Sequence, residues 1–457
     1  MAIDSIPLFS TPEMDRVFSI QNQLQHMARF EWTLSAALES AGLASAGSAN
    51  AIEPCLDASF VELPSLFAQA RDSGNLAIPF LRQLTAAVQT RSEEAARTLH
   101  LGATSQDVLD TALVLQTREA LTLLLASIDE LDPILAASAR EHADTVLPGR
   151  TWLQNGPPTT LGLKIAGWLA ALRRHRQRIE SAQARAEILQ FGGAVGTLAA
   201  LGDKGIAVSS ALAAKLNLHE PDIPWHTHRD NLVEVATTLA MLVGTLGKIA
   251  RDISLLMQTE VAEVFEPSAE GRGGSSTMPH KRNPVASAFI LAAATRMPGL
   301  VATLLSAMPH EHERGLGNWQ AEWETYPEIF CLTSVALDRT LEIARGMEVH
   351  PEKMAANLEA THGIAMSEAI SAALAIHIGR AHAHDLVHRA TQRVHAEDRP
   401  LREILFTTPE IREHLSESEI TRLLDPRNYL GSTRSFIDRV LDKSTAHKRS
   451  VTEKANG

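Results

Sequence analysis

A polar loop at residues 271–284 holds the side chains best suited to chemistry on an anion. It reads Gly-Arg-Gly-Gly-Ser-Ser-Thr-Met-Pro-His-Lys-Arg-Asn-Pro. Its glycines permit backbone angles closed to other residues, and its prolines stiffen the far side. Lys281 and Arg282 supply positive charge and Asn283 a further donor, so the loop can hold a carboxylate through charge-assisted hydrogen bonds. A basic surface turn has the same composition, and that alternative stays open at this point.

Two further polar stretches contain hydroxyl groups beside glycine or proline. The first, residues 100–107, reads His-Leu-Gly-Ala-Thr-Ser-Gln-Asp, and the second, residues 149–160, reads Gly-Arg-Thr-Trp-Leu-Gln-Asn-Gly-Pro-Pro-Thr-Thr. Thr104 and Ser105 come just ahead of a predicted helix, where hydroxyls and free backbone N–H groups can hold a carboxylate at the positive end of the helix dipole. Plain N-capping is the alternative reading.

The composition predicts an all-α protein with a large buried core. The chain has 457 residues, of which 45% are hydrophobic and 21% charged, while only 4% are aromatic, which favours helices packed through alanine and leucine. Its net charge of −12 gives no general basic surface for nucleic acid or anionic lipid. Any anion site is therefore expected to be a local cluster of Arg and Lys that selects small ligands.

The sequence contains no motif that predicts a cofactor, a disulfide framework or a membrane segment. Cys55 and Cys331 lie far apart, which indicates neither a disulfide framework nor a zinc site and fits a reducing cytoplasm. We expect no signal peptide, no membrane-spanning run and, without GxGxxG or Walker patterns, no nucleotide cofactor. His384 and His388 are one helical turn apart, but the sequence holds no HExxH motif, and no metal is expected.

Long helices dominate the middle of the chain. From Leu232, apolar residues recur at alternating spacings of four and three, which predicts one long bundle helix as far as about Phe265. Such a rod is roughly 50 Å long, which suits a bundle shared between subunits better than a compact single chain. Four similar segments complete a set of five: 111–140, with Pro133 inside it, 160–190, where Thr159 or Thr160 can cap the start, 287–308 and 326–347.

These segments predict three domains. Residues 1–110 form an N-terminal domain of shorter helices, residues 111–351 the central bundle with the polar loop, and residues 352–457 a smaller helical domain that ends in a polar tail. The three polar stretches lie at the ends of rods, so we expect them to meet only when different subunits contribute them.

The loop sequence GSSTMPHKRNP and the stretch HLGATSQD resemble the fumarase/aspartase superfamily. That resemblance implies elimination, or its reverse, on a carboxylate substrate in a homotetramer with sites shared between subunits, and no metal. It implies that Ser275 transfers a proton at the carbon beside a carboxylate, with Ser276 its neighbour. Sequence alone leaves open which of the two serines carries the proton.

Trp152 narrows the chemistry. Adenylosuccinate and argininosuccinate lyases typically carry a histidine here that protonates an amine leaving group, and an indole cannot donate that proton at neutral pH. A carboxylate, whose ordinary pKa is about 4, needs no such proton. The substitution therefore permits attack of a carboxylate on a double bond to form a lactone.

Further motifs are similar to those of the 3-carboxy-cis,cis-muconate cycloisomerase family: GRTWLQ, GNLAIPFLRQLTA (74–86), PWHTHRD (224–230) and MPHEHERGLGNWQAEW (308–323). The resemblance covers nearly the whole chain and implies a cytoplasmic cycloisomerase that lactonises this triacid in protocatechuate breakdown, the β-ketoadipate pathway. It implies that Arg314 and Lys281 face each other across the substrate. Expected substrate contacts are Thr104, Ser105, Trp152, Thr159, Asn283, Arg314, His100, Arg229 and His228.

Several alternatives remain at this level. His228 stands where relatives commonly have glutamine, so 3-sulfomuconate is a competing substrate. A lyase of the adenylosuccinate or argininosuccinate type is a second reading, and a non-enzymatic structural protein a third, although the serine loop is intact. Arg314 can instead pair with Glu311 or Glu313, Arg229 with Asp230, and His100 with neighbouring backbone. Arg150 and Arg16 are weaker candidates.

Overall fold

The computed structural model describes residues 8–268, 278 and 281–442. Its contacts divide the chain into two compact units. Unit 1 is formed by Met1–Ile128, His175–Gly247 and Phe289–Asp338, and unit 2 by Asp129–Arg174, Lys248–Ala288 and Arg339–Gly457. The predicted domain boundaries near residues 110 and 351 stay a prediction.

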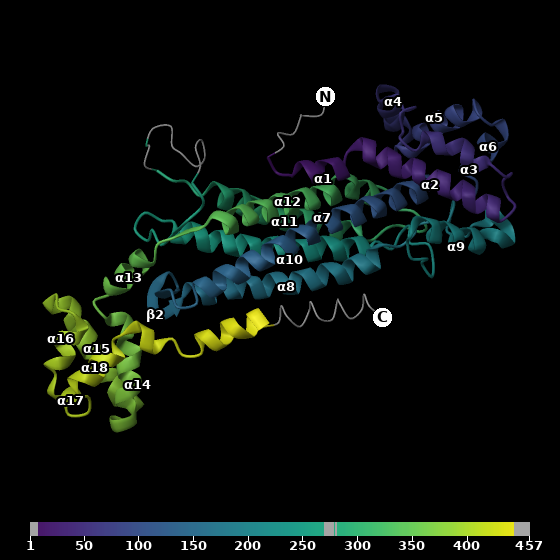
Figure 1. The fold of residues 1–457 in the computed structure, drawn as a ribbon. Coiled ribbons are helices and arrows are strands. Elements are labelled where there is room, and N and C mark those ends of the chain that lie inside the picture. The colour runs from purple at the N-terminus through teal and green to yellow at the C-terminus, as the bar shows by residue number, and fades with distance from the viewer. Residues whose placement is uncertain (1–7, 269–277, 279–280, 443–457) are drawn as a thin grey trace. The chain divides into compact units, whose positions relative to one another are not determined.

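The described chain is mostly helical, as the composition predicts (Figure 1), and five long helices each contribute residues to both units. They are α7 (Ser105–Glu141), α8 (Leu161–Ala186), α10 (Asp230–Leu256), α11 (Val285–Ala307) and α12 (Asn318–Gly346). The predicted α10 was too long, because the chain leaves the helix at Leu256 and Phe265 belongs to a short strand. Thr160 accepts a hydrogen bond from the backbone N–H of Leu163 at 3.2 Å, which confirms that it can cap α8.

The apolar seam of α10 is confirmed by burial. Every predicted position is at most 4% exposed: Val235, Leu239, Leu242, Leu246, Ile249, Ile253 and Leu256. By length and composition alone, α10 and α11 are apolar enough to cross a membrane, although polar residues interrupt both. In the most apolar window of α10, 61% is buried, against 28% for α11. α10 is therefore a core helix, whereas α11 leaves most of that window uncovered in a single chain.

The shorter helices of unit 1 lie mainly in the N-terminal part of the chain. Helix α2 begins after Ser19, whose side chain accepts a hydrogen bond from Asn22 N, and it buries Leu24, Met27 and Leu34. The set comprises α1 (Pro12–Val17), α2 (Ile20–Ser40), α3 (Ser48–Ile52), η1 (Glu53–Cys55), α4 (Leu63–Ser73), α5 (Ala77–Gln89), α6 (Glu93–Thr98), η2 (Ala199–Lys204) and α9 (Gly205–Leu216).

Unit 2 contains two small antiparallel sheets that the all-α prediction missed. Strands β1 (Val146–Thr151) and β2 (Gln154–Thr160) form a hairpin in the second polar stretch, with an irregularity between Pro148 and Arg150. Strands β3 (Val264–Phe265) and β4 (Glu348–Val349) pair just before and well after the serine loop. The glycines and prolines of the second stretch led to the prediction of a loop, so the hairpin was not predicted.

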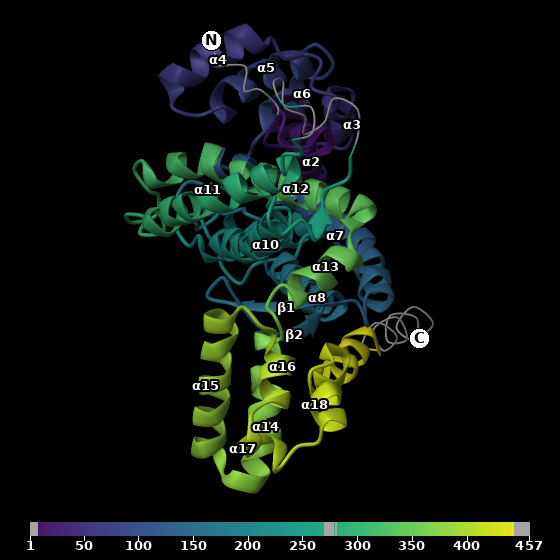
Figure 2. The ribbon, with the colours of Figure 1, turned by 90° about the vertical axis from the view of Figure 1, so that its left-hand side faces the viewer.

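The C-terminal helices of unit 2 enclose a core of their own. Helices α14 and α15 lie side by side (Figure 2) and bury Ile370, Leu374 and Leu386 together with Ile404 of α16. The elements after β4 are α13 (Pro351–Glu359), η3 (Ile364–Met366), α14 (Ser367–Ile378), α15 (Arg380–Glu397), α16 (Leu401–Phe406), α17 (Pro409–Arg412), α18 (Glu417–Leu423) and η4 (Pro426–Tyr429).

We predict that Gly162→Ala destabilises the fold and that Gly167→Ala, five residues along α8, does not. A Cβ at Gly162 meets the Ala139 carbonyl oxygen at 2.5 Å and the Ala143 Cα at 2.7 Å, whereas a Cβ at Gly167 has nothing within 4 Å. Overpacking costs about 1–3 kcal/mol, while alanine in an open helical position gains up to about 1 kcal/mol. Thermal unfolding of both variants tests this, and equal melting temperatures would contradict the close packing of α7 against α8.

Candidate active site

The first polar stretch leads into helix α7 and lines a depression in the surface of unit 1. The depression has a volume of about 610 Å³ and is bordered by His100, Thr104 and Ser105. Arg82, which sequence reasoning did not single out, lies on the same depression, on α5. A cation and two hydroxyls beside the start of a long helix form a surface that suits an anion.

The side chain of Asp107 holds the backbone of this stretch in place from inside the protein. Its buried carboxylate accepts a hydrogen bond from Thr104 N at 2.9 Å and others from Gly192 N and Gly193 N at 3.1 and 2.9 Å. His226 Nε2 and Gln190 Nε2 complete the shell at 2.7 and 3.0 Å. The loop comes this close because Gly193 adopts a φ of +70°, and a Cβ there would meet Gly102 O at 2.7 Å. Thr104 is thus held by a carboxylate inside the protein.

His100 is anchored to a carboxylate rather than to neighbouring backbone. Its Nδ1 lies 2.6 Å from Oε1 of Glu31, whose side chain is fully buried. Burial is the largest single effect and disfavours the imidazolium, but the charge and hydrogen bond of Glu31 together with the charge of Asp107 outweigh it and raise the pKa of His100. His100 also has a φ of +61°, a strained angle for a histidine. The side chain remains partly exposed on the depression and is biased toward its charged form.

Arg229 is fully buried and lies between two carboxylates. Its guanidinium donates to Asp110 of α7 at 2.6 and 3.0 Å and to Glu322 of α12, the two Nε distances being 3.0 and 3.1 Å. Asp110 and Glu322 outweigh the burial penalty and raise the pKa of Arg229. These bonds occupy the guanidinium, and its partners are not the Asp230 that sequence suggested, which corrects the local-pair reading. The predicted substrate contact of Arg229 stays a prediction.

The buried cluster shifts the pKa values of Glu322, which belongs to it, and of His310, which lies beside it. Burial raises the pKa of Glu322, although Arg229 opposes the shift. Burial, and next the positive charge of Arg229, lower the pKa of His310, whose Nε2 lies 3.7 Å from Glu322 Oε1. The cluster is thus one cation facing two carboxyl groups, with a histidine of lowered pKa beside it.

Arg314 is oriented by a glutamine that sequence reasoning missed. Its Nη1 donates to Gln106 Oε1 and its Nη2 to Ala194 O, both at 2.8 Å. Gln106 is fully buried and bonds through Nε2 to Asp110 and to His226 O, each at 2.9 Å. Among the described residues no ion pair joins Arg314 to Glu311 or Glu313. Since only two donors are used, Arg314 keeps N–H groups for a ligand.

The second stretch forms the β1–β2 hairpin of unit 2, with Trp152 at its tip. Trp152 is 97% exposed and Leu153 76% exposed, and both adopt positive φ angles of 52° and 63°. Neither residue type favours that region, so the tip stores strain while it presents apolar surface. Two residues before Trp152, Arg150 forms a bidentate bond to buried Glu263 at 2.6 and 2.9 Å. Thr159 lies on β2, half-buried.

The described residues that flank the serine loop are clamped together. Glu266, at the start of the loop, accepts bonds from Ala286 N and Ser287 N at the first turn of α11, at 2.9 and 2.7 Å. Arg282 donates to Glu348 of β4 at 2.7 and 2.8 Å and lies 4.7 Å from the centre of the Phe265 ring. These contacts join the two ends of the loop at the β3–β4 ribbon.

The predicted site residues divide between the units. Unit 1 holds His100, Thr104, Ser105, His228, Arg229 and Arg314, and unit 2 holds Trp152, Thr159, Lys281 and Asn283. Lys281, Trp152 and His228 are exposed, and Asn283 is half-buried. Ser275 and Ser276 lie outside the described residues.

Comparison with known proteins shows the family of this chain. A family model described as lyase matches residues 10–299, and one described as adenylosuccinate lyase C-terminus matches residues 363–440. The chain belongs to the lyase family of the fumarase/aspartase superfamily.

Three relatives narrow that class. The chain is 50% identical to 3-carboxy-cis,cis-muconate cycloisomerase of Pseudomonas aeruginosa over 95% of its own length and 94% of the relative's. It is 47% identical to the protein of that name from Bradyrhizobium diazoefficiens, over 95% and 97%. The crystal structure of the 3-carboxy-cis,cis-muconate lactonizing enzyme of Pseudomonas putida has a TM-score of 0.91 and 49% identity, covering 96% of this chain and 98% of that one. Within the lyases, this chain is a member of the 3-carboxy-cis,cis-muconate cycloisomerase family.

We predict that Arg229→Gln lowers the free energy of unfolding by about 3–5 kcal/mol, because it leaves two buried carboxylates without their cation. Arg185→Gln is the matched control. Arg185 also forms a bidentate pair, with Glu234, but its side chain is 53% exposed, so its loss is expected to change the unfolding midpoint very little. Urea unfolding of both variants tests this, and similar midpoints would mean that burial adds nothing to the Arg229 cluster.

A second prediction concerns the clamp beside the serine loop. Hydrogen bonds from Arg282 hold the pKa of Glu348 below its ordinary value. A lowered pKa means that the pair stabilises the fold above the ordinary carboxyl pKa of about 4.3 and loses that effect as the pH falls through the lowered value. The melting temperature of Glu348→Gln is therefore expected to lie below wild type near neutral pH and to converge with it in acid. Glu359→Gln, at an exposed glutamate of α13, is expected to show no such convergence.

Proposed function

We propose that this chain converts 3-carboxy-cis,cis-muconate into a carboxymuconolactone, in the cytoplasm, as a step of protocatechuate catabolism. Identity of 50% over 95% of the chain to a relative that bears this name supports the proposal. The observation that carries it is Trp152 at the hairpin tip, where lyases with amine leaving groups need a proton donor. The indole cannot supply that proton, and attack by a carboxylate on a double bond needs no such donor.

The reaction is an internal addition that loses no atoms. An oxygen of one substrate carboxylate bonds to the far carbon of a double bond, and the π electrons move onto the carbon beside a second carboxylate, giving an enediolate-like intermediate. That carbon then takes a proton and the lactone is complete. The protein's tasks are to hold three negative charges, to stabilise the charge that develops and to deliver one proton.

Each task has candidate residues. Thr104 and Ser105 offer hydroxyls and helix-start N–H groups, while Lys281, Asn283 and Arg314 supply cationic and neutral donors for the carboxylates. The raised pKa of His100 favours a further positive charge beside Thr104. In this scheme Arg229 holds Asp110, which positions Gln106 and, through it, Arg314.

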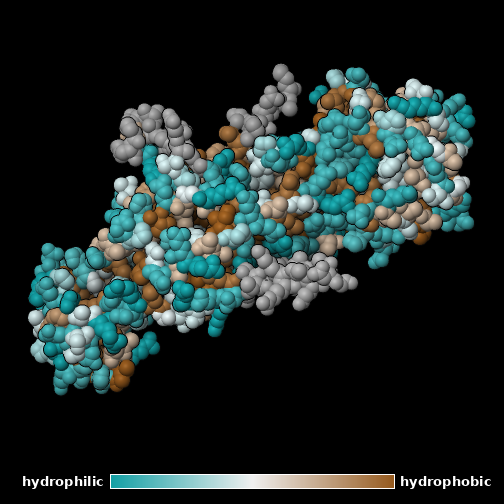
Figure 3. All heavy atoms as spheres, in the orientation of Figure 1, coloured by the Kyte–Doolittle hydropathy of each residue, from teal (hydrophilic) through white to brown (hydrophobic). Residues whose placement is uncertain are grey.

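A shared, tetrameric assembly completes the proposal. The strained and exposed Trp152 and Leu153, together with the uncovered apolar residues of α11, support burial of these surfaces against other copies of the chain. Hydrophobic residues also show between hydrophilic ones on the face drawn in Figure 3. In such a tetramer, Thr104 of one chain and Ser275 of another serve one site.

Ultraviolet absorbance tests the reaction, because lactonisation removes the conjugated diene. Purified protein with 3-carboxy-cis,cis-muconate is expected to abolish the diene band rapidly, with a lactone identified by NMR. Slower turnover of this substrate than of 3-sulfomuconate would transfer the proposal to the sulfo compound. No loss with either substrate, but cleavage of adenylosuccinate or argininosuccinate, would replace it with a lyase reaction.

We predict that Ser275→Ala lowers kcat by about 10²–10⁴-fold, the usual contribution of a positioned proton donor. Ser268→Ala is the matched control, since Ser268 is exposed next to the loop and contacts Glu348 through its backbone. It is expected to keep near-normal turnover. If Ser275→Ala also turns over normally, while Ser276→Ala does not, the proton belongs to the neighbouring serine.

A mixing experiment tests whether chains share their sites. Thr104→Val and Ser275→Ala chains are each expected to be nearly inactive, because each lacks one group of the site. Co-expression is expected to restore part of the activity, since some sites in a mixed tetramer then combine two unaltered contributions. If every mixture is as inactive as its parents although mixed tetramers form, each site is built within one chain.

A further inference from the structure

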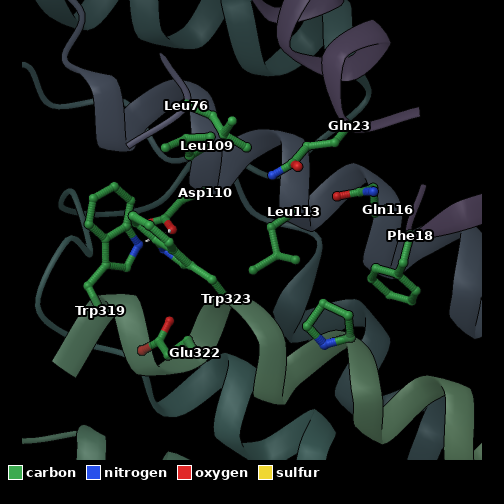
Figure 4. A pocket seen from close by; sticks show the side chains of 11 residues that line it. Phe18, Gln23, Leu76, Leu109, Asp110, Leu113, Gln116, Trp319, Glu322 and Trp323 are labelled. Carbon is green, nitrogen blue, oxygen red and sulfur yellow. Dashed lines mark hydrogen bonds between the residues drawn. The ribbon is translucent and has the colours of Figure 1, made fainter. Parts of the chain in front are cut away.

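Unit 1 contains a second cavity that the proposed reaction does not use. It has a volume of about 190 Å³ and lies between the first half of α7, the first half of α12 and the start of α2, with Leu76 at one side (Figure 4). None of the predicted substrate contacts lines it. A ligand of this cavity would therefore be a molecule other than the substrate.

Aromatic rings line the cavity on two sides. Trp319 and Trp323 meet edge to face with their ring centres 5.0 Å apart, and Phe18 lies on the opposite side (Figure 4). Trp319 is buried and donates its Nε1 hydrogen to Asp110 at 3.1 Å, whereas Trp323 is 38% exposed. The negative faces of indole rings attract cations, and Trp is the strongest side chain in this respect.

The polar wall carries negative charge. Asp110 and Glu322 line the cavity, and their one cationic partner, Arg229, is not among the lining residues. When both carboxyls are ionised, this cluster has a net charge of −1. None of the described residues that line the cavity is Lys or Arg. An anion such as the muconate substrate is therefore repelled, and a cation is attracted.

Gln116 supplies an unused acceptor. The residue is only 3% exposed, and its Nε2 donates to Val17 O at 2.7 Å. Its Oε1 has no hydrogen-bond partner among the described residues and points toward the Gln23 side of the cavity in Figure 4. An amide oxygen that faces the cavity offers an acceptor to a ligand with an N–H donor.

We propose that this cavity binds a small organic ammonium ion, with its NH₃⁺ group toward the carboxylates of Asp110 and Glu322 and its apolar body against Trp323. Each part of the ligand meets a matching surface: hydrogen-bond donors meet an acceptor, positive charge meets net negative charge, and hydrocarbon meets indole. The inference does not rest on the proposed reaction, because its ligand is opposite in charge to the muconate.

Calorimetric titration with benzylammonium tests the proposal, with benzyl alcohol as its neutral isostere. Benzylammonium is expected to bind one molecule per chain and at least about tenfold more tightly than the alcohol, since a desolvated cation–π contact and a charge-assisted bond are both lost in the alcohol. Benzyltrimethylammonium keeps the charge but has no N–H group, so it is expected to bind more weakly than benzylammonium.

Two variants locate the site. Trp323→Leu is expected to weaken benzylammonium binding about tenfold while it keeps the melting temperature, because this indole is partly exposed. Phe67→Leu, at a 43% exposed ring outside the cavity, is the matched control and is expected to bind as wild type. Equal affinity for benzylammonium and benzyl alcohol, unchanged binding by Trp323→Leu, or no saturable binding at millimolar concentrations would each overturn the proposal.

Discussion

A guanidinium without access to water must find negative charge inside the protein, and Arg229 finds it on two different helices. It precedes α10 directly, and its partners Asp110 and Glu322 belong to α7 and α12. One buried cation thereby fixes three long helices to one another within unit 1. Because breaking such a cluster strands uncompensated charge, the geometry around it tolerates little adjustment. Asp110 in turn accepts a hydrogen bond from Gln106, and Gln106 accepts one from Arg314, so the cluster also fixes the positions of these two side chains.

The sequence was a good guide wherever a pattern reflects a repeated physical requirement. The four-and-three spacing of α10 predicts burial because those positions recur on one helix face, and each of them is buried. The polar stretches were found because glycine, proline and hydroxyl groups interrupt a helical chain. The resemblance of these stretches to a known family led to the same family as the full-length comparisons.

Long-range pairing could not be read from the sequence. Arg229 stands next to Asp230, which made a local pair a natural guess, yet its real partners are 119 and 93 residues away. Gln106 and Asp107 were noticed only as part of a motif, since nothing local indicates that they bond to Arg314 or to the loop at Gly192 and Gly193. The β1–β2 hairpin was missed because its turn uses Trp and Leu at positive φ, where glycine or asparagine is the usual sign.

The bonds that hold the two ends of the serine loop affect how the sequence of such a protein can change during evolution. Glu266, Arg282 and Glu348 secure the flanks through bonds that do not involve Ser275 or Ser276. Substitutions at Ser275 or Ser276 therefore leave these bonds in place. A scaffold of this kind can explore new substrates by drift in one short segment while the helices around it stay the same.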